Sequence, residues 1–341
     1  MDEVAVRASE VIEPGGTCEA VVIGRVGVDF YTGAPAIALE DVEQFPRAVG
    51  GYGGNVSTGL ARLGVRTAVI ATVGDDGHGR FIRRFLDREG VDVSGLRTDP
   101  RYRTPLAFYE IWPPERFPVT FYPSAAYWAL APGQIRPDHL AAPLVMVSAT
   151  TLAWEPSRTI VLGALAERRA TAGTSGPDQR WSILDLDWRP VLWADPVEAP
   201  SILLKALPFA DVVIGSEVEF AALEVSPETV ANTANVAVYL KRGELGARFL
   251  RGPTAVDVDP IRVETLCGIG SGDAFAAAVG EGLLRGRAPT LTTRRANAAG
   301  AIVATRLTCS EAMPTDGEIE GLLRARGASP PRSMLHEEAT R

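Results

Sequence analysis

Cysteine and histidine are scarce in this sequence of 341 residues, which has three of each. Cys18, Cys267 and Cys309 are widely spaced and form no Cys-x-x-Cys pair, so the sequence predicts neither a disulfide framework nor a thiolate zinc site. The histidines also lack the spacing of metal ligands. These absences favour a reducing compartment, and we expect a cytoplasmic location.

Long apolar runs and basic clusters are also lacking. No 18 uncharged apolar residues follow one another, and the N-terminus lacks a basic segment before an apolar one, so we expect neither a membrane span nor an export signal. The formal net charge is -8, without a Lys/Arg stripe, which argues against nucleic acid as a partner. A phosphate group would have to be bound locally, by backbone N–H groups, a metal or a few arginines.

Short apolar runs alternate with helical patterns between residues 18 and 326. We expect strands in 18–30, 66–74, 144–151, 181–190, 211–216 and 236–243, and helices in 55–64, 81–90 and 159–170. Such alternation predicts an α/β fold with a doubly wound, mostly parallel sheet flanked by helices. In the first of these runs we expect a turn that points Asp29 out of the strand end. Residues 1–17 and 327–341 are polar and aperiodic, and are predicted to be tails.

The segment 104–123 breaks this alternation. Aromatic and β-branched residues flank a Pro-Pro pair, which predicts an antiparallel hairpin outside the main sheet. Together with residues 30–49, this hairpin is expected to form a small β lid. Lid strands with exposed faces can pair between two copies of a chain, so a homodimer through the lid is also expected.

The segment 266–286 has three glycines at alternate positions, followed by Asp273 and an alanine-rich run of high helix propensity. Glycines let several backbone N–H groups point inward, and a helix N-terminus adds positive potential. We therefore expect an anion hole that fits a transferring phosphoryl group. A carboxylate in the first turn of a helix can also merely complement the helix dipole, so Asp273 alone does not decide the chemistry.

Two other phosphate motifs are not satisfied. The sequence has no GxxxxGK[ST], and GIGSGD (268–273) is not a GxGxxG motif after the first strand. A Rossmann dehydrogenase and a nucleotide-binding regulator without catalysis remain alternatives of other classes.

Two motifs, about 220 residues apart, carry a family resemblance. Gly270-Ser271-Gly272-Asp273 resembles the GAGD core of the ribokinase-like (PfkB) carbohydrate kinases, and Gly50, Gly51 and Asn55 match the GG-x-x-x-N block of the same family. The resemblance spans residues 18–325 and implies a ribokinase-like fold.

Within this family, four stretches are most similar to the 5-dehydro-2-deoxygluconokinases of inositol catabolism: 23–31, 185–193, 267–275 and 296–315. The 2-keto-3-deoxygluconate kinases have a similar D-x-D/N-x-R-P-x-x-W pattern in the second stretch, 185–193. The resemblance therefore implies an acidic deoxy-keto sugar as substrate, with 2-keto-3-deoxygluconate, fructose, ribose or a nucleoside as alternatives.

The resemblance also implies ATP and Mg²⁺ as cofactors. Asp273 would be the general base, while the N–H groups of Gly270, Ser271 and Gly272 would hold the developing negative charge. Glu219 corresponds to the glutamate of the family's N-x-x-E motif, which helps to hold Mg²⁺ largely through water.

On the nucleotide side, the resemblance implies roles for four residues. Lys241, Gly243 and Gly246 match a K-x-G-x-x-G block at a strand end, and Asn297 lies on the helix that would border adenine.

On the substrate side, Asp29 and Asn55 correspond to residues that bind sugar hydroxyls, and Gly50 and Gly51 let the backbone approach the ligand. Arg189 is the expected carboxylate partner, because its planar guanidinium can bind an acid with two hydrogen bonds.

The sequence departs from the family at several positions. Tyr52 and Gly53 alter the sugar-binding block, Ser216 replaces the Asn of N-x-x-E, and Pro123 stands where an arginine often follows. Cys267-Gly268 replaces a leading Asp-Thr, which leaves a monovalent cation as an optional cofactor.

Overall fold

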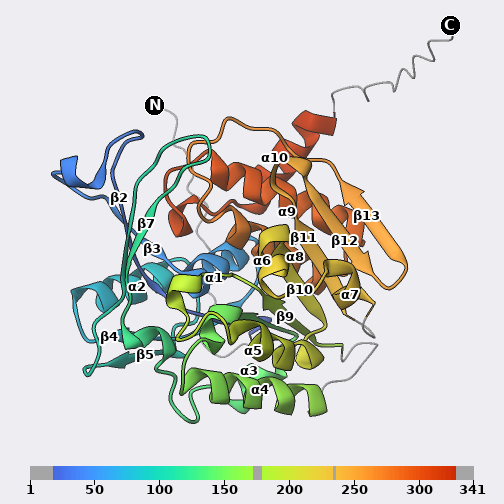
Figure 1. The fold of residues 1–341 in the computed structure, drawn as a ribbon, viewed down its shortest axis with the longest axis horizontal. Helices are drawn as coiled ribbons and strands as arrows, with labels where there is room; N and C mark the ends of the chain where they lie inside the picture. The colour runs from blue at the N-terminus through green and yellow to red at the C-terminus, as the bar shows by residue number, and fades with distance from the viewer. Residues whose placement is uncertain (1–17, 172–178, 233–235, 328–341) are drawn as a thin grey trace, which may run out of the picture.

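The computed structural model describes residues 18–171, 179–232 and 236–327, and within them the main element is a nine-stranded sheet (Figure 1). Its strand order is β13-β12-β11-β10-β9-β8-β1-β4-β5. The bounds are β1 (Ala20–Ile23), β4 (Thr67–Gly74), β5 (Leu96–Asp99), β8 (Leu144–Ser148), β9 (Trp181–Asp185), β10 (Val212–Ser216), β11 (Ala237–Lys241), β12 (Ala247–Arg251) and β13 (Thr254–Val258). All neighbours pair in parallel except β11–β12 and β12–β13. The predicted doubly wound, mostly parallel sheet is confirmed.

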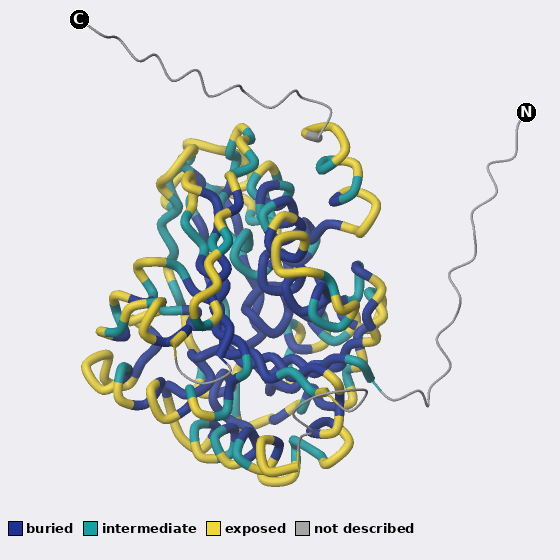
Figure 2. The backbone as a smooth tube through the Cα atoms, turned by 90° about the vertical axis from the view of Figure 1, so that its right-hand side faces the viewer, coloured by how far each residue is buried: buried dark blue, intermediate teal, exposed yellow. Residues whose placement is uncertain are grey.

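Helices cover both faces of this sheet because its central strands are apolar on both sides. Along β1, Val21 and Ile23 belong to one buried cluster, which includes residues of α4 (Ser157–Thr171) and α5 (Ala199–Ala206). The alternate residues Ala20 and Val22 belong to the cluster of the other face, with α1 (Tyr52–Arg62), α8 (Ser271–Leu284), α9 (Pro289–Ala304) and α10 (Asp316–Gly327). Figure 2 shows the buried backbone in the interior and the exposed segments around it.

The remaining helices are α2 (Gly77–Arg88), α3 (Pro137–Ala141), α6 (Glu217–Ala222) and α7 (Pro227–Ala231). The N-terminus of α2 is capped by Asp76, whose carboxylate accepts hydrogen bonds from the N–H groups of His78 and Gly79. This cap explains why α2 begins four residues before the predicted helix at 81–90. No helix in the described part of the chain combines the length and the apolar character that crossing a membrane requires.

A second, four-stranded sheet lies beside the main one, on the left of Figure 1. Its order is β3 (Arg47–Gly50), β2 (Gly27–Tyr31), β6 (Leu106–Tyr109) and β7 (Val119–Tyr122). β6 and β7 pair antiparallel, and β2 lies between β3 and β6. A small sheet in this place fits a lid; the exact lid boundaries stay a prediction.

Two details differ from the predictions. Residues 18–30 do not form one strand with a turn at Asp29: the chain leaves the main sheet after Ile23, and Asp29 lies inside β2, opposite Ala48 of β3 and Ala107 of β6. Pairing on both sides explains why this segment stays extended. The antiparallel strands β12 and β13 were not predicted. The predicted tails lie outside the described residues, apart from Gly327.

Candidate active site

Polar residues gather where the parallel strands of the main sheet end. Arg25 follows β1, Ser148 ends β8, Asp187 follows β9, and Lys241 ends β11. The strand order reverses at β1: the next strand of the main sheet, β4, lies on one side of β1, and the later strand β8 lies on the other. Open α/β sheets bind ligands at such a reversal of strand order.

Asp273 lies in the first turn of α8, at the edge of this region. The helix begins after Gly270, which has a φ of 84° and occupies the left-handed region that favours glycine. One carboxylate oxygen of Asp273 accepts a hydrogen bond of 2.7 Å from the Asn55 amide. Burial raises the pKa of Asp273, and the nearby negative charge of Asp187 raises it further.

Asn55 comes from α1, which begins after Gly51 with a φ of 82°. The Asn55 side-chain oxygen accepts a hydrogen bond of 2.6 Å from the Ser310 hydroxyl. This bond leaves the amide nitrogen to donate to Asp273, so Asn55 orients the carboxylate. Sequence reasoning placed Asn55 on the sugar, and its contact with Asp273 was missed.

Asp29 of β2 and Gly50 of β3 lie against each other in the second sheet. A side chain at Gly50 would overlap the Asp29 carboxylate, which explains the glycine. Asp29 is 3% exposed, and burial raises its pKa to about 7. Neither residue lines the cavity beside Asp273, whereas Gly51 and Asn55 do.

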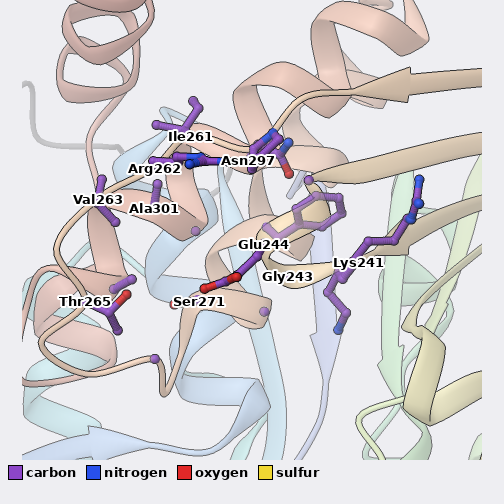
Figure 3. Close-up of a pocket in the computed structure, with 18 of the residues that line it drawn as sticks. Lys241, Gly243, Glu244, Ile261, Arg262, Val263, Thr265, Ser271, Asn297 and Ala301 are labelled. Atoms are coloured by element: carbon purple, nitrogen blue, oxygen red, sulfur yellow. The ribbon is translucent and has the colours of Figure 1, made fainter. Parts of the chain in front are cut away.

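Two cavities meet at the glycine loop. The larger, of about 740 Å³, is lined by Lys241, Gly243, Gly246, Ser271 and Asn297 among others (Figure 3). The smaller, of about 330 Å³, is lined by Arg25, Gly51, Asn55, Asp273 and Arg189 among others. Lys241, Gly268 and Gly272 line both. Of the residues predicted for the nucleotide, Gly243, Gly246 and Asn297 therefore line the larger cavity alone, and Lys241 lies on the wall shared with the smaller one. Asp273 lies beside this wall.

Lys241 forms two ion pairs at this wall. Its Nζ lies 3.3 Å from Glu219 Oε2 and 3.6 Å from Asp185 Oδ1. Burial opposes the charge of Lys241, yet the two carboxylates raise its pKa above the ordinary value. A Cβ atom at Gly272 would lie 3.4 Å from Nζ, so the ammonium group lies close to the glycine loop.

Glu219 lies in the first turn of α6, and two backbone N–H groups hold its carboxylate in place. Its Oε2 accepts a hydrogen bond of 2.6 Å from the Ser216 N–H, and its Oε1 accepts one of 3.3 Å from the Trp188 N–H. The described residues include no group of three or more His, Cys, Asp or Glu side chains that could hold a metal ion.

Three charged residues of the site were not assigned from the sequence: Arg25, Asp185 and Asp187. Asp187 lies 3.3 Å from Arg25 and 3.5 Å from Arg189, and it accepts a hydrogen bond of 2.8 Å from Ser148. Burial opposes its charge, but the two arginines hold its pKa below the ordinary value. The signal in the sequence was the position of Asp185 and Asp187 at the end of an apolar strand.

Comparison with known proteins points to carbohydrate kinases. Residues 17–316 match the model of the pfkB family carbohydrate kinases. A 5-dehydro-2-deoxygluconokinase of Bacillus licheniformis is 31% identical over 322 residues, 90% of this chain and 96% of that protein. The enzyme of the same name from Photobacterium profundum is 30% identical over 311 residues, 87% of this chain and 92% of its own. A sugar kinase of Pyrococcus horikoshii, solved in complex with ATP, is 26% identical with a TM-score of 0.76, and the match covers 89% of this chain and 99% of that one.

Proposed function

Since this chain belongs to the PfkB family of carbohydrate kinases, we propose that it transfers a phosphoryl group from ATP to a hydroxyl group of 5-dehydro-2-deoxygluconate. The observation that carries the proposal is the position of Asp273 at the junction of two cavities that share Lys241, Gly268 and Gly272. One cavity suits the nucleotide, the other suits a small sugar acid, and the phosphoryl group crosses between them.

Asp273 acts as the general base in this proposal. Its carboxylate takes the proton of the attacking hydroxyl, while Asn55 holds the carboxylate in one orientation through the 2.7 Å hydrogen bond. The raised pKa of Asp273 makes it a stronger base than an exposed aspartate.

The glycine loop and Lys241 stabilise the charge that develops on the phosphoryl group. The N–H of Ser271, the first residue of α8, donates a hydrogen bond of 3.4 Å to the Gly268 carbonyl, whereas the N–H groups of Gly272 and Asp273 have no partner within the helix and can face an anion. The helix dipole favours negative charge at this end. Lys241 adds a full positive charge close to Gly272. Phosphoryl transfer depends mainly on such positioning and electrostatic stabilisation.

The larger cavity is the proposed ATP site, with Asn297 at the adenine end and Gly243 and Gly246 along its wall. Magnesium bound with ATP would neutralise phosphate charge, and Glu219 would hold its water ligands. A requirement for a monovalent cation stays a prediction, which omission of K⁺ from the assay tests.

A coupled ADP-release assay tests the proposal. The full chain is given ATP, Mg²⁺ and, in turn, 5-dehydro-2-deoxygluconate, 2-keto-3-deoxygluconate, fructose, ribose and a nucleoside. We expect the highest kcat/KM for 5-dehydro-2-deoxygluconate. A higher value for a neutral sugar would refute the substrate, and no sugar-dependent turnover would refute the function.

The proposed partner is a second copy of the chain, bound through the second sheet. Its strands β3 and β7 each pair on one side only within the described residues. Phe30, Phe108 and Tyr122 form an aromatic row on this sheet, with ring centroids 5.0 Å and 5.5 Å apart, and Tyr122 is 58% exposed. Size-exclusion chromatography with light scattering tests this: Tyr122→Glu should convert a dimer to a monomer.

A further inference from the structure

Arg25 is a buried cation in the smaller cavity. It follows the end of β1, is 7% exposed and lines the cavity together with Asp273 and Arg189. Its guanidinium carbon lies 6.0 Å from the centroid of the Phe121 ring and 5.8 Å from that of Tyr127, so the charge sits against aromatic groups and away from bulk water. Charge interactions are stronger in such surroundings than at the surface.

The guanidinium of Arg25 has donor capacity that its protein contacts leave unused. An arginine has five N–H donors, and the hydrogen bond of 3.3 Å to Asp187 takes up one of them. The buried Nε has no hydrogen-bond partner in the part of the chain that the structure describes. Nε itself is enclosed by protein, so a ligand oxygen in the cavity would accept from the four terminal N–H groups of the guanidinium, of which the contact with Asp187 takes up one.

Asp187 does not neutralise the positive charge around it. Arg25 lies on its Oδ2 and Arg189 on its Oδ1, so two guanidinium groups share one carboxylate. The other carboxylates of the cavity are Asp185, Glu219 and Asp273, and Lys241 pairs with the first two of these. An acidic substrate would be repelled at the Asp273 end and attracted at the Arg25–Asp187–Arg189 end.

We propose that Arg25 binds the carboxylate of the substrate together with Arg189, and so sets the preference for a sugar acid over a neutral sugar. This inference rests on the proposed function and names the residue that would give it its selectivity. Arg189 is half-exposed at the cavity mouth, with 49% of its side chain accessible, whereas only 8% of the Arg25 side chain is accessible. Arg25 is therefore the better fixed of the two cations.

The test compares two substrates in four proteins. The substrates are 5-dehydro-2-deoxygluconate and the neutral ketose in which a hydroxymethyl group replaces the carboxylate. The proteins are the parent, Arg25→Met, Arg25→Lys and, as a matched control, Arg285→Met. Arg285 forms an ion pair of 2.9 Å with Glu19 and lines neither cavity, so its replacement removes a charge without touching the site.

We expect Arg25→Met to raise KM for the acid by about tenfold to hundredfold, the usual effect of losing a charge-assisted hydrogen bond. KM for the neutral ketose should change by less than about threefold, because that ligand makes no ionic contact. Arg25→Lys should keep part of the preference, since it retains the charge but not the planar fork. Arg285→Met should keep the parent's ratio of kcat/KM for the two substrates.

Equal losses on both substrates in Arg25→Met would overturn the proposal and leave Arg25 a structural partner of Asp187. If Arg25→Met does not fold by circular dichroism, Arg25→Lys decides: an unchanged acid preference would overturn the proposal, and a reduced one would support it. A parent that prefers the neutral ketose would instead refute the proposed substrate. If the parent prefers the acid and both Arg25 variants keep that preference, the role of Arg25 is refuted while the proposed substrate stands.

Discussion

The side-chain amide of Asn55 donates a 2.7 Å hydrogen bond to the carboxylate of Asp273, a residue 218 positions later in the chain. The bond joins α1 to α8, and the Ser310 hydroxyl fixes the amide from the other side. The two family motifs of the sequence thus meet in one contact, which orients the Asp273 carboxylate.

Asp273→Asn is expected to lower kcat by about 10²-fold to 10⁴-fold, the range for removal of a positioned general base. The amide has nearly the same shape as the carboxylate, so folding and nucleotide binding should change little. Steady-state kinetics beside an ATP titration separate the two effects. Turnover near the parent rate would refute the assignment of Asp273.

Asn55→Leu is expected to move the acidic limb of the pH profile of kcat/KM to higher pH. Burial already raises the pKa of Asp273, and the Asn55 hydrogen bond lowers it. Without that bond the carboxylate holds its proton to higher pH, and the base is active only when the proton is lost. A variant with the parent's acidic limb and a lower plateau would show that Asn55 acts on the sugar and not on Asp273.

Gly272→Val is expected to abolish phosphoryl transfer, although no side chain is lost. A Cβ atom at this position would lie 3.4 Å from Lys241 Nζ, so a branched side chain would crowd the ammonium group and the space for the phosphate. Gly163→Val, on the exposed side of α4 with no atom near its Cβ, is the matched control. The control should stay active, and a folded Gly272→Val variant with parent activity would refute the anion-hole assignment.

Asp29→Asn is expected to stabilise the protein more at pH 8 than at pH 5. Burial raises the folded-state pKa of Asp29 to about 7 from an ordinary value of 3.8. The unfolded chain therefore releases this proton first, and the parent loses stability as the pH rises from about 4 to 7. The asparagine removes this loss, which amounts to about 2.6 kcal/mol between pH 5 and 8. Thermal melts at several pH values measure it, and a pH-independent difference would contradict the raised pKa.

The main sheet could be predicted from the sequence because its strands are short apolar runs that end at polar residues. The position of Asp273 in the first turn of a helix, directly after a glycine loop, could be predicted because the motif is local, while the roles of these residues stay predictions. Asp29 could not be placed correctly, since its strand pairs with β3 and β6 and those pairings are not visible in a single segment. Arg25 and Asp187 were missed for a similar reason: they form a pair of 3.3 Å although they lie 162 positions apart in the sequence.

Asp29 is carried by the second sheet, whereas Asp273 is carried by a helix packed on the main sheet. Arg25 is the first charged side chain after β1 and stands on the short connection between the two sheets, against Phe121 of β7. A ligand held by Arg25 and Asp273 would therefore contact the connection between the two sheets as well as the reacting end of the cavity. Binding at the sugar site would then favour the relative position that the two sheets have in this structure.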